Sequence, residues 1–159
     1  MGRRDKYSIP GQWQSRPIEM LESPAHRVLT LAAHRVIDRI AVELAHHGGQ
    51  ENGRLPVTFD NFESYGIDRG SIAPAIREAV ALGFIEVTEK GRAAAGEWRS
   101  PNLFRITFQP ILNRNKAVAL PTNDWSKIET IEAALVIQKA ARQASERPRT
   151  LRSSLRVVS

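Results

Sequence analysis

The arginines near the C-terminus are the side chains whose type and spacing most directly indicate chemistry. Four of them recur at short intervals with Glu146 as the one opposing acid, and they are Arg147, Arg149, Arg152 and Arg156. Guanidinium groups in such a run can contact nucleic-acid phosphates, which makes binding depend on salt. The alternative is an unstructured, solvated tail, a common fate of terminal residues. We favour the phosphate-binding interpretation.

Histidine is the other residue type here that could support a chemical site. His46 and His47 are adjacent at the expected end of a helix, and no carboxylate cluster lies at metal-ligand spacing around them. A solvated helix end, where imidazole suits the negative end of the helix dipole, is the favoured interpretation. The chain has no cysteine, and no Ser/His/Asp order has supporting context. We therefore expect no enzyme, no metal and no cofactor.

The distribution of charge says more than its total. The chain of 159 residues has a formal net charge of +6, yet residues 1–6 carry +2 and residues 139–159 carry +5, which leaves the rest at −1. A basic chain suggests a nucleic-acid partner, but here the positive charge lies at the ends. The length of the chain indicates one domain. The apolar stretches are too short to span a bilayer, and no apolar segment follows the basic N-terminus. We therefore expect a cytoplasmic protein without a membrane segment.

The segment 66–85 gives the most specific structural signal. Its order is a turn at Gly66, a helix, a glycine stop at Gly83 and the first residues of a strand. This is the order of the second half of a helix-turn-helix that runs into a β-hairpin wing. An exposed helix held at a fixed angle is a common means of entering the major groove of DNA.

The flanking sequence predicts the elements that position this helix. Ser23 and Pro24 predict a helix start, with serine as N-cap and proline at the first helical position, and apolar residues recur on one face as far as Leu44. Thr58 is expected to cap a short helix. Alternating patterns predict strands at 84–88 and 103–108, with a polar hairpin loop between them.

This order of elements resembles the winged-helix family of bacterial DNA-binding proteins over Pro24 to Phe108. Gly66 and Ile67 match the turn glycine and the hydrophobe after it, and 82–85 match the exit from the helix into the strand. The resemblance implies that exposed residues of the helix touch bases and phosphates, and that the wing adds backbone contacts. The residues that it places against bases are Arg69, Gly70, Ser71, Ala73, Pro74 and Arg77. The candidates that it places on the wing are Lys90, Arg92 and Arg99.

Two of these positions depart from the family pattern. Members usually carry polar or basic residues where this chain has Ala73 and Pro74; alanine can still contact a thymine methyl group. Proline inside a helix also clashes with the carbonyl four residues before it. We therefore expect Gly70 or Ser71, rather than Asp68, to cap the helix, so that Pro74 falls in its first turn.

The expected fold is mainly α, a winged helix-turn-helix with a small β-hairpin wing and a long C-terminal helix. Its parts are an N-terminal arm (1–22), the winged-helix domain (23–109), a linker (110–122), the C-terminal helix (123–145) and a basic flexible tail (146–159). The C-terminal helix is apolar over a wide arc, which suggests a homodimer through 123–145, although it could instead fold back on the first helix.

The expected function is sequence-specific binding of double-stranded DNA by a transcriptional regulator. Two alternatives remain. One is a replication initiator or accessory protein of a plasmid or phage. The other is a winged-helix module that binds proteins and not DNA, because fold alone does not give function.

Overall fold

The computed structural model describes residues 9–92 and 100–144. Within them the elements in chain order are α1 (Ile18–Glu22), α2 (Pro24–Arg27), α3 (Leu31–His46), β1 (Leu55–Val57), α4 (Phe59–Ser64), α5 (Arg69–Ala81), β2 (Ile85–Glu89), β3 (Asn102–Ile106), β4 (Ile111–Asn113), β5 (Lys116–Ala119), the 3-10 helix η1 (Asp124–Lys127) and α6 (Ile131–Gln143).

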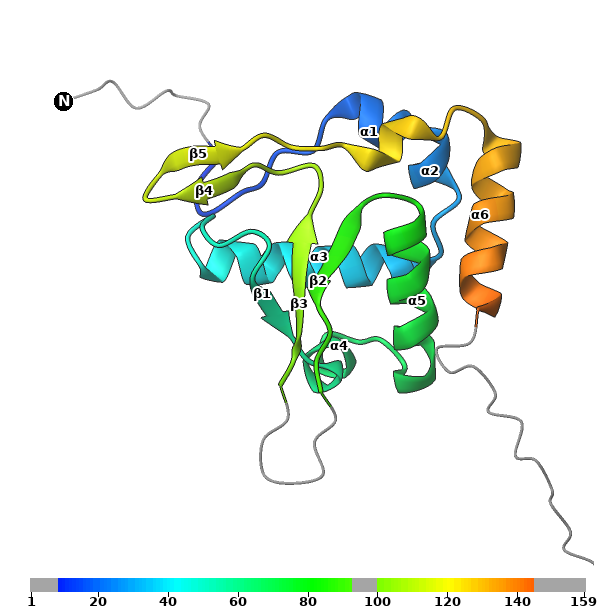
Figure 1. The fold of residues 1–159 in the computed structure, drawn as a ribbon, viewed down its shortest axis with the longest axis horizontal. Coiled ribbons are helices and arrows are strands. Elements are labelled where there is room, and N and C mark those ends of the chain that lie inside the picture. Colours follow the sequence, from blue (N-terminus) through cyan, green and yellow to red (C-terminus); the bar gives the residue numbers. More distant parts are fainter. Residues whose placement is uncertain (1–8, 93–99, 145–159) are drawn as a thin grey trace, which may run out of the picture.

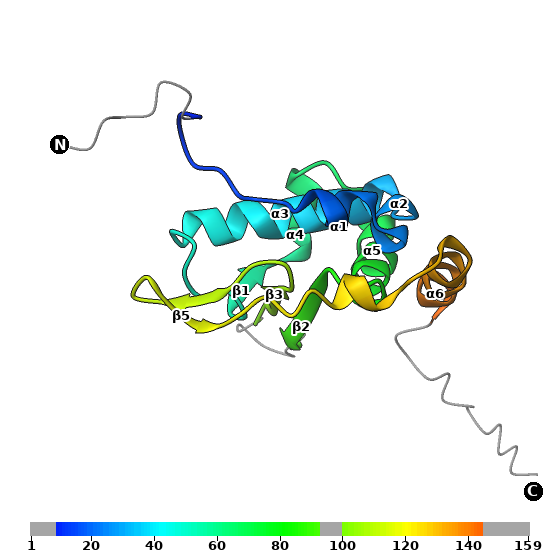
Figure 2. The same ribbon diagram turned by 90° about the horizontal axis from the view of Figure 1, so that it is seen from above.

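The strands form two antiparallel sheets. The first has the order β1-β3-β2, with Leu55 opposite Phe104 and Ile85 opposite Ile106. The second is the β4–β5 hairpin. Helix α3 packs against α5, β1 and β3, and α6 stands beside α5 at the opposite end of the molecule from the β4–β5 hairpin (Figures 1 and 2).

The predicted fold class is wrong. In place of a mainly helical winged helix-turn-helix with a single hairpin wing, the described residues form a mixed α/β structure with six α-helices and two small antiparallel sheets, of three and two strands. The prediction counted one hairpin because it assigned residues 110–122 to a linker.

The second hairpin forms where the linker was expected. Arg114 and Asn115 both have positive φ, 49° and 63°, and they join Asn113 to Lys116 as a two-residue loop. Positive φ at both central residues defines the type I′ turn, whose twist matches that of antiparallel strands. Arginine is not a residue that signals this turn, and the prolines at either end of the segment favoured a linker.

Several local predictions for the first half of the chain are confirmed. Ser23 caps α2 through a hydrogen bond from the His26 amide, with Pro24 at the first position. Thr58 caps α4 in a full capping box with Asn61. The single helix expected from Pro24 onward is instead two helices, because Thr30 accepts the Ala33 amide and begins α3.

The predicted start of α5 is wrong. The helix begins at Arg69 with Asp68 as N-cap, whose side chain makes no capping hydrogen bond, so Pro74 lies inside the helix rather than in its first turn. Pro74 has no amide hydrogen to donate to the Gly70 carbonyl, four residues before it. Because Gly70 is exposed, water can hydrate that carbonyl.

The long helix expected at 123–145 is also shorter than predicted. Asn123 has φ 47°, η1 follows it, and α6 starts only after its N-cap Thr130. η1 lies directly on Gly83, where a Cβ would come within 2.5 Å of the Asp124 and Trp125 backbone. Glycine is therefore required at this position, since it allows both the close approach and its own φ of +88°.

One continuous core joins these elements. Its largest fully buried apolar side chains are Met20, Val36, Ile40, Leu55, Phe62, Ile72, Leu82, Phe84, Ile85, Phe104 and Ile106. They come from the helices and from the three-stranded sheet, so burial of apolar surface fixes α5 against α3 and the sheet. Across the described ranges, no helix has the length and apolar character needed to cross a membrane.

Candidate nucleic-acid interface

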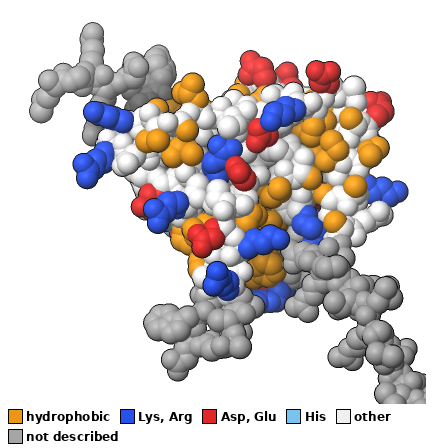
Figure 3. Space-filling model, in the orientation of Figure 1, with side chains coloured by type: hydrophobic (Ala, Val, Ile, Leu, Met, Phe, Trp, Pro, Cys, Tyr) orange, Lys and Arg blue, Asp and Glu red, His pale blue; other side chains and the backbone are white. Residues whose placement is uncertain are grey.

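A groove runs between α5 and the strands β2 and β3. The start of α4 and the end of α6 complete its walls, and its volume is about 1170 Å³. We call it the basic groove, because four cations expected to contact DNA line it: Arg69, Arg77, Lys90 and Arg92. At the lower edge of the view in Figure 3, Lys and Arg side chains lie around hydrophobic ones.

Arg69 lies at the start of α5 and is held by two acids. Its Nη1 donates to Asp60 Oδ1 at 2.8 Å and to Glu63 Oε2 at 3.0 Å. These hydrogen bonds, that of Asp60 first, raise the pKa of Arg69. The side chain is still 56% exposed, so its guanidinium can be reached from the groove.

Arg77 lies two turns further along α5 and contacts the end of α6. Its Nε donates to the Ala141 carbonyl at 3.0 Å, and Nη2 donates to the Arg142 carbonyl at 3.2 Å. The last carbonyls of a helix have no partner within it, so a cation satisfies them and also suits the helix dipole. Arg77 therefore helps to hold α6 against α5.

Lys90 and Arg92 lie on the opposite wall, just beyond β2. Both are exposed, and neither side chain makes an ion pair within the described residues. The backbone beneath them is fixed: the Gly91 amide donates to Asn102 Oδ1 at 2.7 Å, and the Arg92 amide donates to Ser100 Oγ at 2.9 Å. The connection between β2 and β3 thus carries into the groove two cations that have no acidic partner among the described residues.

The structure places the remaining predicted residues elsewhere. Gly70, Ser71, Ala73 and Pro74 do not line the basic groove; Gly70 is exposed and the other three are half-buried. Arg99 and the tail arginines Arg147, Arg149, Arg152 and Arg156 lie outside the described residues. Twelve side chains other than glycine were predicted to touch DNA, and seven of them belong to the described residues. The structure brings four of these seven together in one groove.

A buried carboxylate was not predicted from the sequence. Glu78 on α5 is fully buried and accepts hydrogen bonds from the Thr30 amide at 2.8 Å, from Thr30 Oγ1 at 2.9 Å and from Arg142 Nη1 at 2.8 Å. Gln138 Nε2 approaches the same carboxylate at 3.4 Å. The cluster joins α3, α5 and α6. The glutamate lies within the apolar stripe of a helix, and this position could have indicated a buried carboxylate. Its hydrogen-bond partners, however, lie far away in the sequence.

The histidines form no metal site among the residues that the structure describes. His26 and His34 pack edge to face, with ring centroids 4.8 Å apart. Asp38, four residues after His34 in the sequence, forms an ion pair with Arg16. Burial lowers the pKa of both histidines, so the neutral imidazole is favoured in the folded protein.

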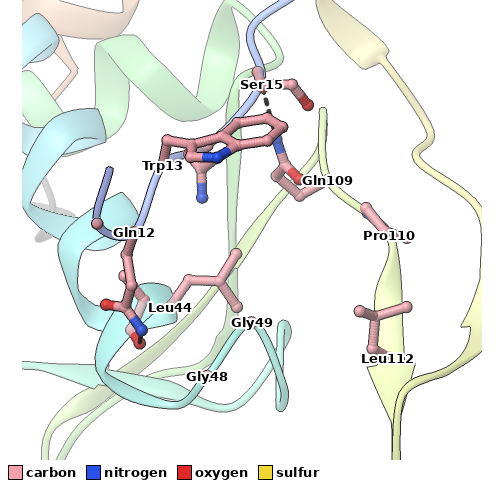
Figure 4. A pocket seen from close by; sticks show the side chains of 12 residues that line it. Gln12, Trp13, Ser15, Leu44, Gly48, Gly49, Gln109, Pro110 and Leu112 are labelled. Atoms are coloured by element: carbon pink, nitrogen blue, oxygen red, sulfur yellow. Dashed lines mark hydrogen bonds between the residues drawn. The ribbon is translucent and has the colours of Figure 1, made fainter. Parts of the chain in front are cut away.

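A second, smaller pocket of about 390 Å³ lies where the N-terminal arm crosses the end of α3 (Figure 4). Gln12 Nε2 donates to the Ala45 carbonyl at 3.3 Å, and Gln109 Nε2 donates to the Ser15 carbonyl at 2.7 Å. The Trp13 side chain remains 70% exposed. None of the described lining residues is charged.

Comparisons with protein-family models, with curated proteins and with solved structures found no match to this chain.

Proposed function

We propose that this protein binds double-stranded DNA through the basic groove and acts, without catalysis, as a transcriptional regulator. The observation that supports the proposal is the convergence of Arg69 and Arg77 from α5 with Lys90 and Arg92 from the hairpin on one groove. These residues are up to 23 positions apart in sequence, and the fold brings them to one surface.

The charge balance of the groove favours an anionic partner. Among the described residues that line it, two are acidic, Asp60 and Glu86, and four are cations. Asp60 already pairs with Arg69, and Glu86 accepts from Arg105 Nε at 2.9 Å. Lys90 and Arg92 are therefore left to neutralise phosphates, and each phosphate contact releases counterions and adds affinity.

The sequence also continues from this groove into two segments that carry further arginines. Arg92 and Ser100 line the groove and flank residues 93–99, which contain Arg99 and one acid, Glu97. Ala144 lines it too and is followed directly by 145–159, with four arginines and one glutamate. Both segments are thus joined to residues that line the groove, which supports duplex DNA as the partner.

The elements that carry the cations suit a duplex in shape. Helix α5 has 13 residues, a length of about 20 Å, and the major groove of B-DNA admits a helix or a two-stranded ribbon. We assign phosphate contacts to Lys90 and Arg92. Arg69 is the groove cation that we assign to bases, because it is exposed at the start of α5.

A replication protein of a mobile element would bind a duplex in the same way, so it remains an alternative role for the same site. A module that binds a protein partner is a second candidate. It is favoured by the apolar side chains of Ile76, Val80 and Val87 in the groove and by the engagement of Arg77 with α6.

The experiment compares binding of fluorescent duplex DNA by the full chain and by two charge-matched variants. Lys90→Gln/Arg92→Gln removes two groove cations. Arg114→Gln/Lys116→Gln removes two exposed cations from the β4–β5 hairpin. We expect the groove variant to lose about tenfold or more in affinity, since each lost phosphate contact weakens binding to every sequence, and the control to bind like wild type.

Single-stranded DNA and duplex RNA of the same length complete the test. Preference for duplex DNA supports the proposal. Equal loss in both variants, or no binding by the wild type at low salt, would overturn it. Val80→Ser should leave DNA affinity unchanged; if it alone impairs function in cells, the protein-binding candidate is favoured instead.

A further inference from the structure

Helix α6 has two faces, and its own chain occupies one of them. Ala134 is fully buried, and Gln138 and Arg142 reach Val28, Thr30 and Glu78. This side packs against α2 and α5. The inward face of α6 therefore has no room for a second molecule.

The outward face of the same helix is apolar at its centre. Val136 is 70% exposed and Leu135 is 49% exposed, and Ala133 and Ala140 beside them are exposed as well. Hydrophobic side chains gather on the right of the view in Figure 3, where Figure 1 places α6. Exposed apolar side chains that gather on one helix face mark an interaction site more often than single ones do.

Two opposite charges flank this apolar centre. Glu132 and Lys139 are both exposed, and neither forms an ion pair within 9–92 or 100–144. They lie seven residues apart, two helical turns or about 10 Å along the axis, on the same side of the helix. The midpoint between them falls between Leu135 and Val136.

We infer that a second copy of this chain docks on this face, with the two α6 helices antiparallel. A two-fold axis through the midpoint would place Glu132 opposite the partner's Lys139, and Lys139 opposite the partner's Glu132. Leu135 and Val136 would meet their counterparts at the centre. An isologous interface must be self-complementary in this way, because the same patch serves both copies.

This interface is small, which sets the expected strength of the dimer. A helix of 13 residues is about 20 Å long, and a pair of such helices buries less than the roughly 1,200 Å² of a standard stable interface. The dimer is thus a reversible one that forms as protein concentration rises. The inference goes beyond DNA binding and does not depend on it.

The test is sedimentation equilibrium of the full chain, without DNA, from micromolar to millimolar concentration. We expect the apparent mass to rise from one chain toward two. Glu132→Lys and Lys139→Glu should each weaken association about tenfold, because each places like charges opposite one another at both pairs. The double variant, which swaps the charges, should restore it.

A mixture of the two single variants gives a sharper result. In a heterodimer of the Glu132→Lys and Lys139→Glu chains, both charge pairs are opposite in sign, so the mixture should associate more strongly than either variant alone. Lys127→Glu, an exposed change outside α6, is the matched control and should associate like wild type. Circular dichroism confirms that each variant is folded.

Three outcomes overturn the inference. The first is a monomer mass for wild type at all concentrations. The second is a dimer that none of the charge variants weakens, since another face would then form it. The third is a charge-swapped double variant that stays monomeric.

Discussion

Replacement of Arg142 by methionine should destabilise the protein strongly, although the residue lies in the last turn of the C-terminal helix. The change keeps much of the apolar length of the side chain and removes its charge. Glu78 would then remain fully buried with neutral donors alone, the Thr30 amide and hydroxyl and the Gln138 amide.

The magnitude follows from burial of the two partners. Breaking a buried ion pair from one side costs about 3–5 kcal/mol, because the remaining charge is left uncompensated. The Arg142 side chain is 34% exposed, so water screens part of that loss. The Thr30 donors, at 2.8 and 2.9 Å, stabilise part of the charge that remains. We therefore expect a loss of about 2–3 kcal/mol.

Urea unfolding measures this free energy. Glu78→Gln combined with Arg142→Met should be less destabilised than the sum of the two single changes, since no buried charge is then left unpaired. Lys127→Ala breaks the exposed pair with Asp124 and should change stability by less than about 0.5 kcal/mol. An Arg142→Met protein within that same margin of wild type would refute the role assigned to Glu78.

Three further predictions concern pH, a buried amide and a helix cap. Burial lowers the pKa of His26 and His34 below their ordinary 6.5, so as the pH falls the unfolded chain takes up protons before the folded protein does. The free energy of unfolding should therefore be constant above about pH 7 and decline below about pH 6.5. Urea titrations between pH 7.5 and 5.5 check this, and replacement of both histidines by glutamine should remove the decline. Asn52 is buried and bonds both the amide and the carbonyl of Ile106; Asn52→Ala should cost about 2–3 kcal/mol in the same assay, and a neutral effect would contradict that role. Thr58→Ala should cost about 1 kcal/mol through loss of the capping box, as measured by thermal unfolding, and an unchanged melting temperature would argue against the cap.

Local signals in this sequence predicted local structure well. Ser23 and Thr58 cap helices as expected, because a cap depends on residues within three positions of itself. The apolar stripe of α3 is buried from Ala33 to Leu44, because helical periodicity is visible in the sequence itself. Lys90 and Arg92 were proposed as DNA contacts from the winged-helix resemblance, and they line the groove because they directly follow β2.

Contacts between residues that are distant in the sequence could not be predicted from local patterns. The engagement of Arg77 with the end of α6 joins positions 64 and 65 residues apart, and no pattern in the sequence indicates it. The β4–β5 hairpin was missed because Arg114 takes a left-handed conformation that its residue type rarely signals. The mixed α/β fold departs from the prediction largely through this hairpin.

The salt dependence of DNA binding tests the central claim most directly. The slope of log K against log salt counts the phosphates that the protein neutralises, about 0.9 per contact on duplex DNA. We predict that Lys90→Gln/Arg92→Gln lowers the magnitude of the slope by about 2, and that Arg114→Gln/Lys116→Gln leaves it unchanged. A slope that is the same for the groove variant and wild type would contradict binding in the basic groove.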